Sequence, residues 1–294
     1  MTYLNMDKIK IGIGTSSIGR FLPYIGQAAG LFEQAGLAVE IVNQLDEEKV
    51  VTDIVSGETP IGTPNAPSLI FSLLEDNDLV IVGGVLNRPA FFLAATSSIR
   101  TIADLKGKKI GINQPRRMAG MVMLALLRRW GIDGQRDLTL VDGGVNDRTF
   151  EALQKSDIVA ALLPPEKAFF AEAQGFKIVA DSHDLDCHWV PLVTTRRFLA
   201  QHGELVKKVA AVYVESIAYY RRERGKACEE ISRQLPVMQK HPAVLAKCYD
   251  VFAAGFEPSL TASVSSIDAA LREVTLQDAR AGNLSAQSFV VPMR

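Results

Sequence analysis

The sequence predicts an α/β fold with two halves of alternating strands and helices, followed by a helical C-terminal tail. Its 294 residues correspond to about two domains at roughly 150 residues each. Short β-branched segments alternate with segments of helical period from residue 9 to residue 180. From about Phe198 onward, apolar residues recur only with the period of an α-helix. Strand–helix alternation of this kind favours mostly parallel sheets with right-handed crossovers.

Each half contains enough elements for one sheet flanked by helices. In the first half we expect strands at 9–14, 38–42, 61–62 and 79–86, and helices at 24–34, 47–56 and 67–74. In the second half we expect strands at 91–95, 108–112, 138–141, 158–163 and 176–180, and helices at 117–130, 148–155 and 166–173. The tail is expected to form helices at 204–223, 227–235, 243–253 and 265–281.

Charge and hydropathy exclude several classes of protein. Lysine and arginine number 32 against 33 aspartates and glutamates, so the net charge of −1 provides no field that would hold nucleic acid. No apolar run reaches the roughly 18 residues of a membrane span. Residues 1–10 contain no apolar h-region, so we expect no signal peptide. The chain is therefore expected to be cytoplasmic if it is complete, or periplasmic if a leader has been removed.

The sequence predicts no metal site and no cofactor. Cys187, Cys228 and Cys248 are too widely spaced for a zinc motif, and their disulfide state stays open. The run 181–188 is rich in aspartate and histidine, but its spacing matches no closed zinc site and is more typical of a polar loop. A dinucleotide fingerprint also fails, because the third glycine after the first strand comes two positions too late.

Four stretches resemble one family of binding proteins. They are GQAAGLFEQAGL at 26–37, IVSGETPIG at 54–62, IADLKGKKIG at 102–111, which is the most specific, and TTRRFL at 194–199. In this order they resemble the type 2 periplasmic substrate-binding proteins, nearest to the sulfonate/taurine/nitrate group and its thiamin-pyrimidine-synthase-like relatives. Gly26 replaces the family's alanine and Pro60 its aspartate. The resemblance covers roughly residues 8–255.

The resemblance implies a two-lobed architecture with the ligand in a cleft. Lobe 1 would contain residues 1–87 and 190–294, and lobe 2 would contain 88–189. Two hinge segments would lie near 85–87 and 188–190. Because only two short segments would join the lobes, hinge closure around a ligand is the expected motion.

The resemblance also implies a function. A member of this family would capture a small anionic organic solute, act as a monomer and deliver the solute to an ABC permease. The alternative is a cytoplasmic enzyme on the same fold, such as a decarboxylase, a desulfinase or a pyrimidine-precursor synthase. The thiamin synthases use a histidine and a cysteine-rich stretch, whereas this chain has no histidine before His183 and no cysteine cluster. We therefore favour a binding protein without catalysis.

Candidate ligand-binding residues follow the strands, because ligands of parallel sheets bind beyond the carboxyl ends of the strands, often at helix N-termini. From lobe 1 we expect Ser16, Ser17, Tyr24, Thr63 and Asn65. The hydroxyls and the amide could bind polar ligand atoms, and the tyrosine could stack on a ring. Capping of the next helix is an equally good interpretation for the serines and for the asparagine.

From lobe 2 we expect Gln114, Arg116, Arg117, Asp142, Asn146 and Glu166. The family often has small residues at the first of these turns, where this chain has two arginines. An arginine directed into the cleft would supply a bidentate fork for a carboxylate, sulfonate or phosphate. The alternative is a surface arginine pair. Glu166 would also suit a helix N-terminus for purely structural reasons.

Overall fold

The computed structural model describes residues 6–293, which form two compact units. Unit 1 contains the chain up to Asn87, then Cys187–Pro242, and the chain from Phe252 onward. Unit 2 contains Arg88–Asp186 and the short segment Ala243–Val251. Neither unit is therefore built from one continuous stretch of sequence.

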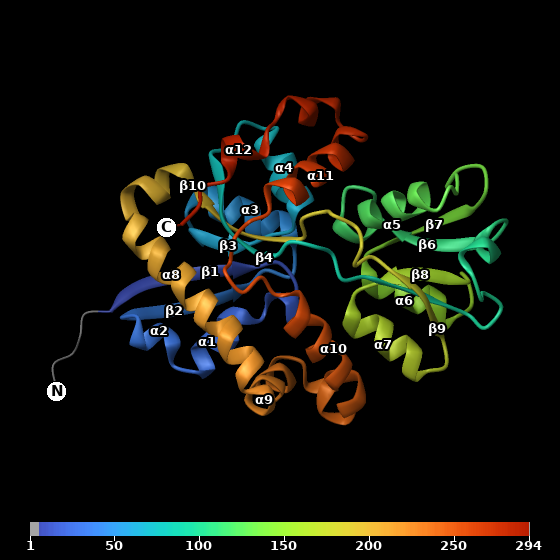
Figure 1. Cartoon of the computed structure of the whole chain (residues 1–294), viewed down its shortest axis with the longest axis horizontal. Helices are drawn as coiled ribbons and strands as arrows, with labels where there is room; N and C mark the ends of the chain where they lie inside the picture. The colour runs from blue at the N-terminus through green and yellow to red at the C-terminus, as the bar shows by residue number, and fades with distance from the viewer. Residues whose placement is uncertain (1–5, 294) are drawn as a thin grey trace. The chain divides into compact units, whose positions relative to one another are not determined.

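The sheet of unit 1 has five strands in the order β2-β1-β3-β10-β4 (Figure 1). Its strands are β1 (Asp7–Ile13), β2 (Leu37–Asn43), β3 (Ile61–Thr63), β4 (Leu79–Leu86) and β10 (Val190–Thr195). Strand β1 pairs in parallel with β2 and β3, whereas β10 pairs antiparallel with β3 and β4. All eight residues of β4 and all six of β10 are buried, so this side of the sheet is covered on both faces.

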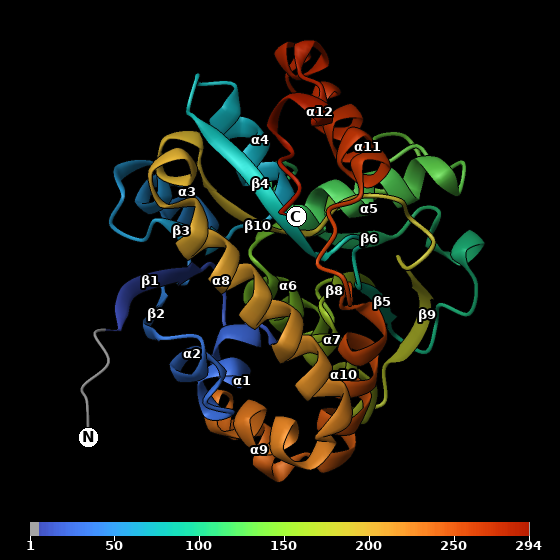
Figure 2. The ribbon, with the colours of Figure 1, turned by 60° about the vertical axis from the view of Figure 1, so that its left-hand side comes forward.

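Helices cover both faces of this sheet. They are α1 (Leu22–Ala28), α2 (Leu31–Gln34), α3 (Glu47–Ser56), α4 (Ala66–Leu73), α8 (Arg196–Arg222), α9 (Arg224–Gln234), α11 (Val264–Thr275) and α12 (Ala286–Phe289). Helices α1 and α8 lie side by side (Figure 1; Figure 2). Gly26 permits this approach, because a Cβ there would lie 2.5 Å from the hydroxyl of Ser216. Helix α10 (Pro242–Gly255) supplies Ala243–Val251 to unit 2.

Unit 2 repeats the same topology, with the strand order β7-β6-β8-β5-β9. Its elements are β5 (Phe92–Ala95), β6 (Lys109–Asn113), α5 (Met118–Arg129), β7 (Thr139–Gly144), α6 (Asn146–Gln154), β8 (Ala160–Leu163), α7 (Pro165–Ala173) and β9 (Lys177–Asp181). Helices α6 and α7 pack on one face around buried Leu153, Ile158 and Leu163 (Figure 1). Helix α5 lies on the other face (Figure 1).

The predicted fold class is confirmed, with one refinement. The sheets are mixed rather than mostly parallel, because one strand in each runs in reverse and pairs antiparallel with both of its neighbours: β10 in unit 1 and β5 in unit 2. In both cases the reversed strand is the first strand after the chain has crossed from the other unit. The predicted helical tail consists of α8, α9, α11 and α12 in unit 1 together with α10.

Three helices differ from the sequence-based boundaries. The expected helix at 24–34 is two helices, because Gly30 adopts a left-handed conformation with φ of +68° between α1 and α2. Helix α8 begins at Arg196, since the hydroxyl of Thr195 caps it by accepting the N–H of Phe198 at 3.0 Å, and it kinks at His202, so the predicted start at 204 matches the segment after the kink. Helix α11 ends at Thr275, and a separate 3-10 turn follows at Ala279–Asn283.

A glycine in α5 provides a test of the packing in unit 2. A Cβ at Gly120 would overlap the carbonyl oxygens of Asn113 and Gln114, which are backbone atoms that cannot move aside cheaply. We expect Gly120→Ala to lower the free energy of unfolding by about 3 kcal/mol in urea denaturation. Gly203→Ala is the control, because a Cβ there meets nothing within 4 Å in α8. It should leave stability unchanged or raise it by about 0.5 kcal/mol. Equal losses in the two variants would contradict this packing.

Candidate functional site

A buried ion pair lies where the strands of unit 1 end. Nη2 of Arg20 donates to Oε1 of Glu47 at 2.7 Å, and the two residues are only 3% and 6% exposed. Arg20 belongs to the short 3-10 turn after β1, and Glu47 is the first residue of α3 after β2. The ion pair therefore joins two neighbouring strand-to-helix turns. Burial of either charge alone would be costly, so each residue requires the other.

The second carboxylate oxygen of Glu47 reaches a third turn. Oε2 accepts the backbone N–H of Asn65, which follows β3, at 2.7 Å. The carboxylate also lies against Gly14, where a Cβ would come within 2.5 Å of it. Glycine is needed at this position because the carboxylate occupies the space of a side chain. One buried glutamate thus fixes the turns that follow β1, β2 and β3.

Several buried polar atoms of this region lack hydrogen-bond partners in the described part of the chain. They are Nε of Arg20, Oγ1 of Thr63 and the hydroxyl of Tyr213. Burial raises the pKa of Tyr213, and the nearby charge of Arg20 opposes part of that rise. Buried polar groups are normally paired, so this region has unused hydrogen-bonding capacity. Thr63 is one of the predicted ligand-binding residues.

The other predicted residues of unit 1 have mixed surroundings. Ser16 is exposed, and its hydroxyl accepts Nδ2 of Asn43 at 2.8 Å. The amide oxygen of Asn65 caps α4 by accepting the N–H of Ser68 at 2.9 Å, which is the structural role left open by the sequence. Ser17 precedes the 3-10 turn, but its side chain does not cap it.

Tyr24 lies on α1. Its ring meets Phe21 edge to face at 5.6 Å between centroids. Burial raises the pKa of Tyr24, and the charge of Glu230 in α9 adds to that rise. The side chain is thus half-buried next to α9.

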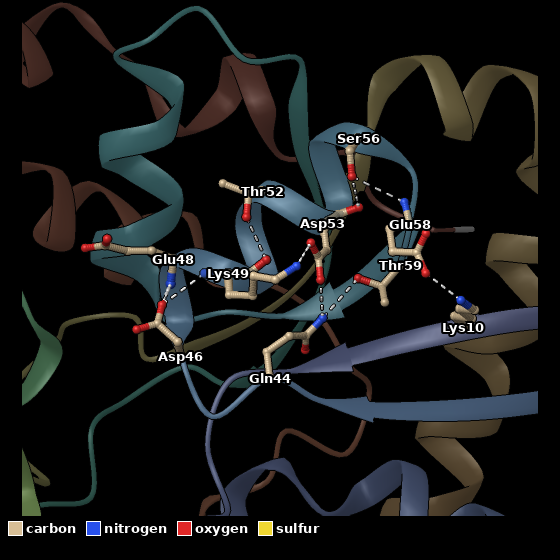
Figure 3. Close-up of polar contacts among 10 residues, drawn as sticks. All are labelled: Lys10, Gln44, Asp46, Glu48, Lys49, Thr52, Asp53, Ser56, Glu58 and Thr59. Carbon is tan, nitrogen blue, oxygen red and sulfur yellow. Dashed lines mark hydrogen bonds and ion pairs between the residues drawn. The ribbon is translucent and has the colours of Figure 1, made fainter.

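A second polar network supports the turn between β2 and α3 (Figure 3). Nε2 of Gln44 donates to Oδ2 of Asp53 at 2.9 Å, and Lys49 pairs with the other oxygen of the same carboxylate. The side chain of Asp46 accepts the N–H groups of Glu48 and Lys49 at 2.8 and 3.0 Å, and so caps α3. These bonds hold Gln44 and Asp46 on either side of Leu45.

In unit 2 a network of uncharged side chains lies at the ends of β6 and β7, the strands that correspond to β1 and β2 in the strand order. Nδ2 of Asn113 donates to Oδ1 of Asn146 at 2.6 Å, and Oδ1 of Asn113 accepts the hydroxyl of Thr149 at 2.8 Å. Asn113 and Thr149 are buried, at 5% and 1% exposure. Asn113 ends β6 and Asn146 begins α6, so this network joins the turns after β6 and β7.

The two arginines of unit 2 differ in exposure. Arg116 is exposed, whereas Arg117 is half-buried and precedes the first residue of α5. Nε of Arg117 donates to Oε1 of Gln114 at 3.4 Å, and the backbone N–H of Gln114 donates to the carbonyl of Gly144 at 3.5 Å. Arg117 is thus connected to the turn after β7 through Gln114.

Asp142 and Glu166 have other surroundings. Oδ1 of Asp142 accepts the N–H of Gly144 at 2.7 Å, and the residue lines a cavity of about 750 Å³ within unit 2 together with Arg128 and Arg136. Glu166 is buried at 8% exposure near the thiol of Cys248 in α10. Burial, together with the charge of Glu166, raises the pKa of Cys248.

The polar run at 181–188 forms ordinary loop contacts. His183 pairs with Asp181, and its Nε2 lies 3.2 Å from Oδ1 of Asp184. The hydrogen bond to Asp181 raises the pKa of His183. Within residues 6–293 no group of three or more His, Cys, Asp or Glu side chains is placed to hold a metal ion. Over the same residues, no helix combines the length and apolar character that a membrane crossing needs.

His188 lies in the segment that returns the chain to unit 1. Its backbone N–H donates to the carbonyl of Ser266 at 2.9 Å, and Nδ1 lies 3.4 Å from the Ser266 hydroxyl. Nε2 is buried without a partner in the described chain, and burial lowers the pKa of His188 to about 3. The next residue, Trp189, donates its N–H to the carbonyl of Leu86 at 3.1 Å.

Sequence reasoning missed Arg20, Glu47 and Asn113. A glutamate in the first turn of a helix is favoured by the helix dipole alone, so Glu47 gave no functional signal. Arg20 is in a loop next to serines, where a solvent-exposed arginine is the ordinary expectation. Asn113 did carry a signal, since a polar residue at the carboxyl end of a buried strand marks the edge where ligands bind.

The ion pair makes a specific prediction about stability. In Glu47→Gln the buried guanidinium of Arg20 loses its counter-charge, so we expect the free energy of unfolding to fall by about 3 kcal/mol. Glu58→Gln is the matched control, because Glu58 pairs with Lys10 at 2.5 Å on the surface. Urea denaturation should show no significant change for that variant. A loss in the Glu47 variant no larger than in the control would contradict the structural role of the pair.

His188 makes stability depend on pH. The unfolded chain protonates this histidine near its ordinary pKa of 6.5, whereas the folded chain resists protonation down to about pH 3. The unfolded state therefore binds more protons in that window, and stability falls as pH drops from about 6.5 toward 3. From pH 7 to pH 5 the loss due to this residue should be about 2 kcal/mol. His188→Met should remove that part of the pH dependence, and an unchanged profile would contradict it.

Comparisons with known proteins agree with this fold. Residues 21–226 match the family model described as "NMT1/THI5 like". A Haemophilus influenzae protein, provisionally named a thiamine biosynthesis protein, is 29% identical over 89 residues, which is 30% of this chain and 28% of that relative. The chain thus matches less than a third of that relative's length.

Two solved structures are similar over nearly the whole chain. The alkanesulfonate-binding protein of Xanthomonas axonopodis pv. citri, bound to MOPS, has a TM-score of 0.77 at 19% identity and covers 97% of this chain and 98% of its own. The periplasmic aliphatic sulphonate binding protein of Escherichia coli has a TM-score of 0.75 at 20% identity, with coverage of 94% and 92%. At these identities the likeness establishes the periplasmic-binding-protein fold. Because the family model matches well over half of the residues, the chain belongs to the NMT1/THI5-like family.

Proposed function

We propose that this protein binds a small anionic organic solute between its two units and releases it unchanged. The family and the fold support a binding role, since the similar solved structures include an alkanesulfonate-binding protein and an aliphatic sulphonate binding protein. We further propose that the units close on the solute about hinge segments at 85–87 and 188–190. Hinge closure around a ligand is a common motion of proteins built from two such units.

One observation carries the proposal. In each unit, buried polar contacts fix the turns at the carboxyl ends of the parallel strands. Unit 1 uses Glu47, which binds Arg20 and the backbone of Asn65, and unit 2 uses Asn113, which binds Asn146. Parallel sheets bind their ligands at this edge, and a site needs rigid turns to select its ligand.

The anionic character of the ligand rests on the helix that begins after β6. Helix α5 starts at Met118 without a side-chain cap, and the first N–H groups of a helix favour an anion. Arg117 lies at the start of α5 and could supply two parallel hydrogen bonds to a carboxylate or sulfonate. Arg116 is the more exposed of the two arginines, so we assign the ligand contact to Arg117.

The proposed setting follows the solved neighbours. The Escherichia coli neighbour is a periplasmic protein. Another similar structure, from Methylobacillus flagellatus, is described as the periplasmic sulfonate-binding protein of a sulfonate ABC transporter. We propose that this chain likewise works as a periplasmic monomer that delivers its solute to an ABC permease. A thermal-shift series at increasing protein concentration would test the monomer, because an oligomer's unfolding temperature depends on concentration.

A ligand screen tests the proposed function. Alkanesulfonates, aromatic carboxylates and pyrimidines are added at increasing concentration while thermal unfolding is followed. A ligand at 100 times its Kd should stabilise the protein by about 2.7 kcal/mol. The hit should be recovered chemically unchanged after prolonged incubation. Stabilisation by uncharged compounds alone would contradict the anionic assignment, and consumption of the ligand would show an enzyme instead.

Arg117→Ala should weaken binding of an acidic hit by tenfold or more, because a charge-assisted bidentate contact is lost. Arg100→Ala is the control, since Arg100 is an exposed arginine of unit 2 outside these turns. Isothermal titration calorimetry gives both affinities. Equal affinities in the two variants would remove Arg117 from the site.

A further inference from the structure

We propose that Leu45 determines ligand specificity by covering an apolar part of the bound solute. This inference rests on the proposed function and names the ligand more closely. The solute would carry an alkyl chain or a ring next to its anionic group, and it would not be a bare inorganic anion. Four observations about the turn between β2 and α3 lead to this conclusion.

The first observation is the backbone of Leu45. Its φ of +56° lies in the left-handed region, which side-chain-bearing residues rarely adopt. Glycine adopts this conformation without steric cost, and asparagine tolerates it better than leucine does. The turn would therefore fold more easily with either of those residues. A leucine at this position needs a reason other than the local fold.

The second observation is the exposure of the side chain. Leu45 is 68% exposed, which is the highest value among the exposed large apolar side chains of residues 6–293. Leu276 is almost equally exposed at 66%, but its backbone is ordinary, with φ of −66°. Exposed leucines alone are common on protein surfaces. Leu45, however, combines a backbone conformation that leucine disfavours with an apolar side chain that is exposed to solvent.

The third observation is that neighbouring residues hold this conformation in place. Oδ1 of Asn43 accepts the N–H of Leu45 at 3.2 Å. Gln44 is anchored to Asp53 at 2.9 Å, and Asp46 caps α3. Strained residues persist only where their surroundings fix them, and they gather at ligand-binding sites. The turn is therefore built to present the Leu45 side chain.

The fourth observation is the position of the turn. Asn43, which holds the backbone of Leu45, also donates to the hydroxyl of Ser16 at 2.8 Å. Two residues beyond Leu45, Glu47 fixes Arg20 and Asn65. Leu45 thus belongs to the turns at the strand ends of unit 1, where we propose that the solute binds. An apolar side chain at this point gains burial when a ligand brings apolar surface to it.

The experiment uses two homologous series, n-alkyl sulfonates and n-alkyl carboxylates with one to eight carbons, and measures each Kd by calorimetry. For the unaltered protein we expect affinity to rise by up to about fourfold for each methylene that becomes buried. In Leu45→Asn and Leu45→Gly this dependence on chain length should flatten, while the affinity for the shortest acid stays within twofold. Leu45→Met should keep the dependence, because it retains an apolar side chain of similar size.

Stability provides the second measurement. Because asparagine and glycine relieve the strained backbone, the unfolding midpoint of Leu45→Asn or Leu45→Gly without ligand should rise by about 2 °C. Leu276→Asn is the matched control and should change neither the midpoint nor the chain-length dependence. A more stable variant with weaker binding of long-chain acids is the result that supports the proposal.

Two failures can be told apart. If the unaltered protein binds neither series, the proposed function is contradicted and this inference falls with it. If acids bind through Arg117 but Leu45→Asn keeps the full dependence on chain length, the proposed function stands and the role of Leu45 is wrong.

Discussion

The candidate site of unit 1 depends on the buried contact between Arg20 and Glu47. A carboxylate that is 6% exposed must have its charge balanced and its oxygens bonded, and both conditions are met by groups from different turns. The glutamate therefore sets the spacing of three loops that would otherwise move separately. It also imposes a glycine at position 14, because no side chain fits beside it. The remaining polar groups of this edge, including Thr63 and Asn65, take their positions from this arrangement.

In unit 2 the turns after β6 and β7 are joined without a charged group. Its turns are joined by the amide of Asn113, which donates to Asn146 and accepts from Thr149. An amide can satisfy a donor and an acceptor at once, so no counter-ion is required. The turns after the first two strands of each sheet thus differ in the groups that join them: the ion pair of Arg20 and Glu47 in unit 1, and uncharged amides and a hydroxyl in unit 2.

Periodicity and turn residues were sufficient to predict nine of the ten strands of the described chain and the location of Asn65, because these depend on patterns within about ten residues of sequence. Strand β10 was not predicted, since the segment 190–195 was expected to be a hinge crossing and the start of the helical tail. The pairing of Arg20 with Glu47 spans 27 residues and depends on how closely two turns approach, which no local pattern records. Leu45 runs against its own backbone preference, so a local rule would assign glycine or asparagine there. The break at Gly30 was missed for a related reason, since the apolar period continues across it. The sequence predicted the sheets and the turns at the ends of their strands. Tertiary contacts determine which side chains hold those turns together.

The strand order of unit 1 has a consequence for synthesis of the chain. Strand β10 lies between β3 and β4 and pairs with both, yet it is made only after nearly all of unit 2. A nascent chain that has left the ribosome as far as Asp186 can complete the sheet of unit 2 but holds an unfilled gap in its own first sheet. Until residues 190–195 emerge, the inner edges of β3 and β4 expose unpaired backbone groups that other chains could bind. Folding of this protein on the ribosome would therefore finish in unit 2 before it finishes in the unit that was begun first.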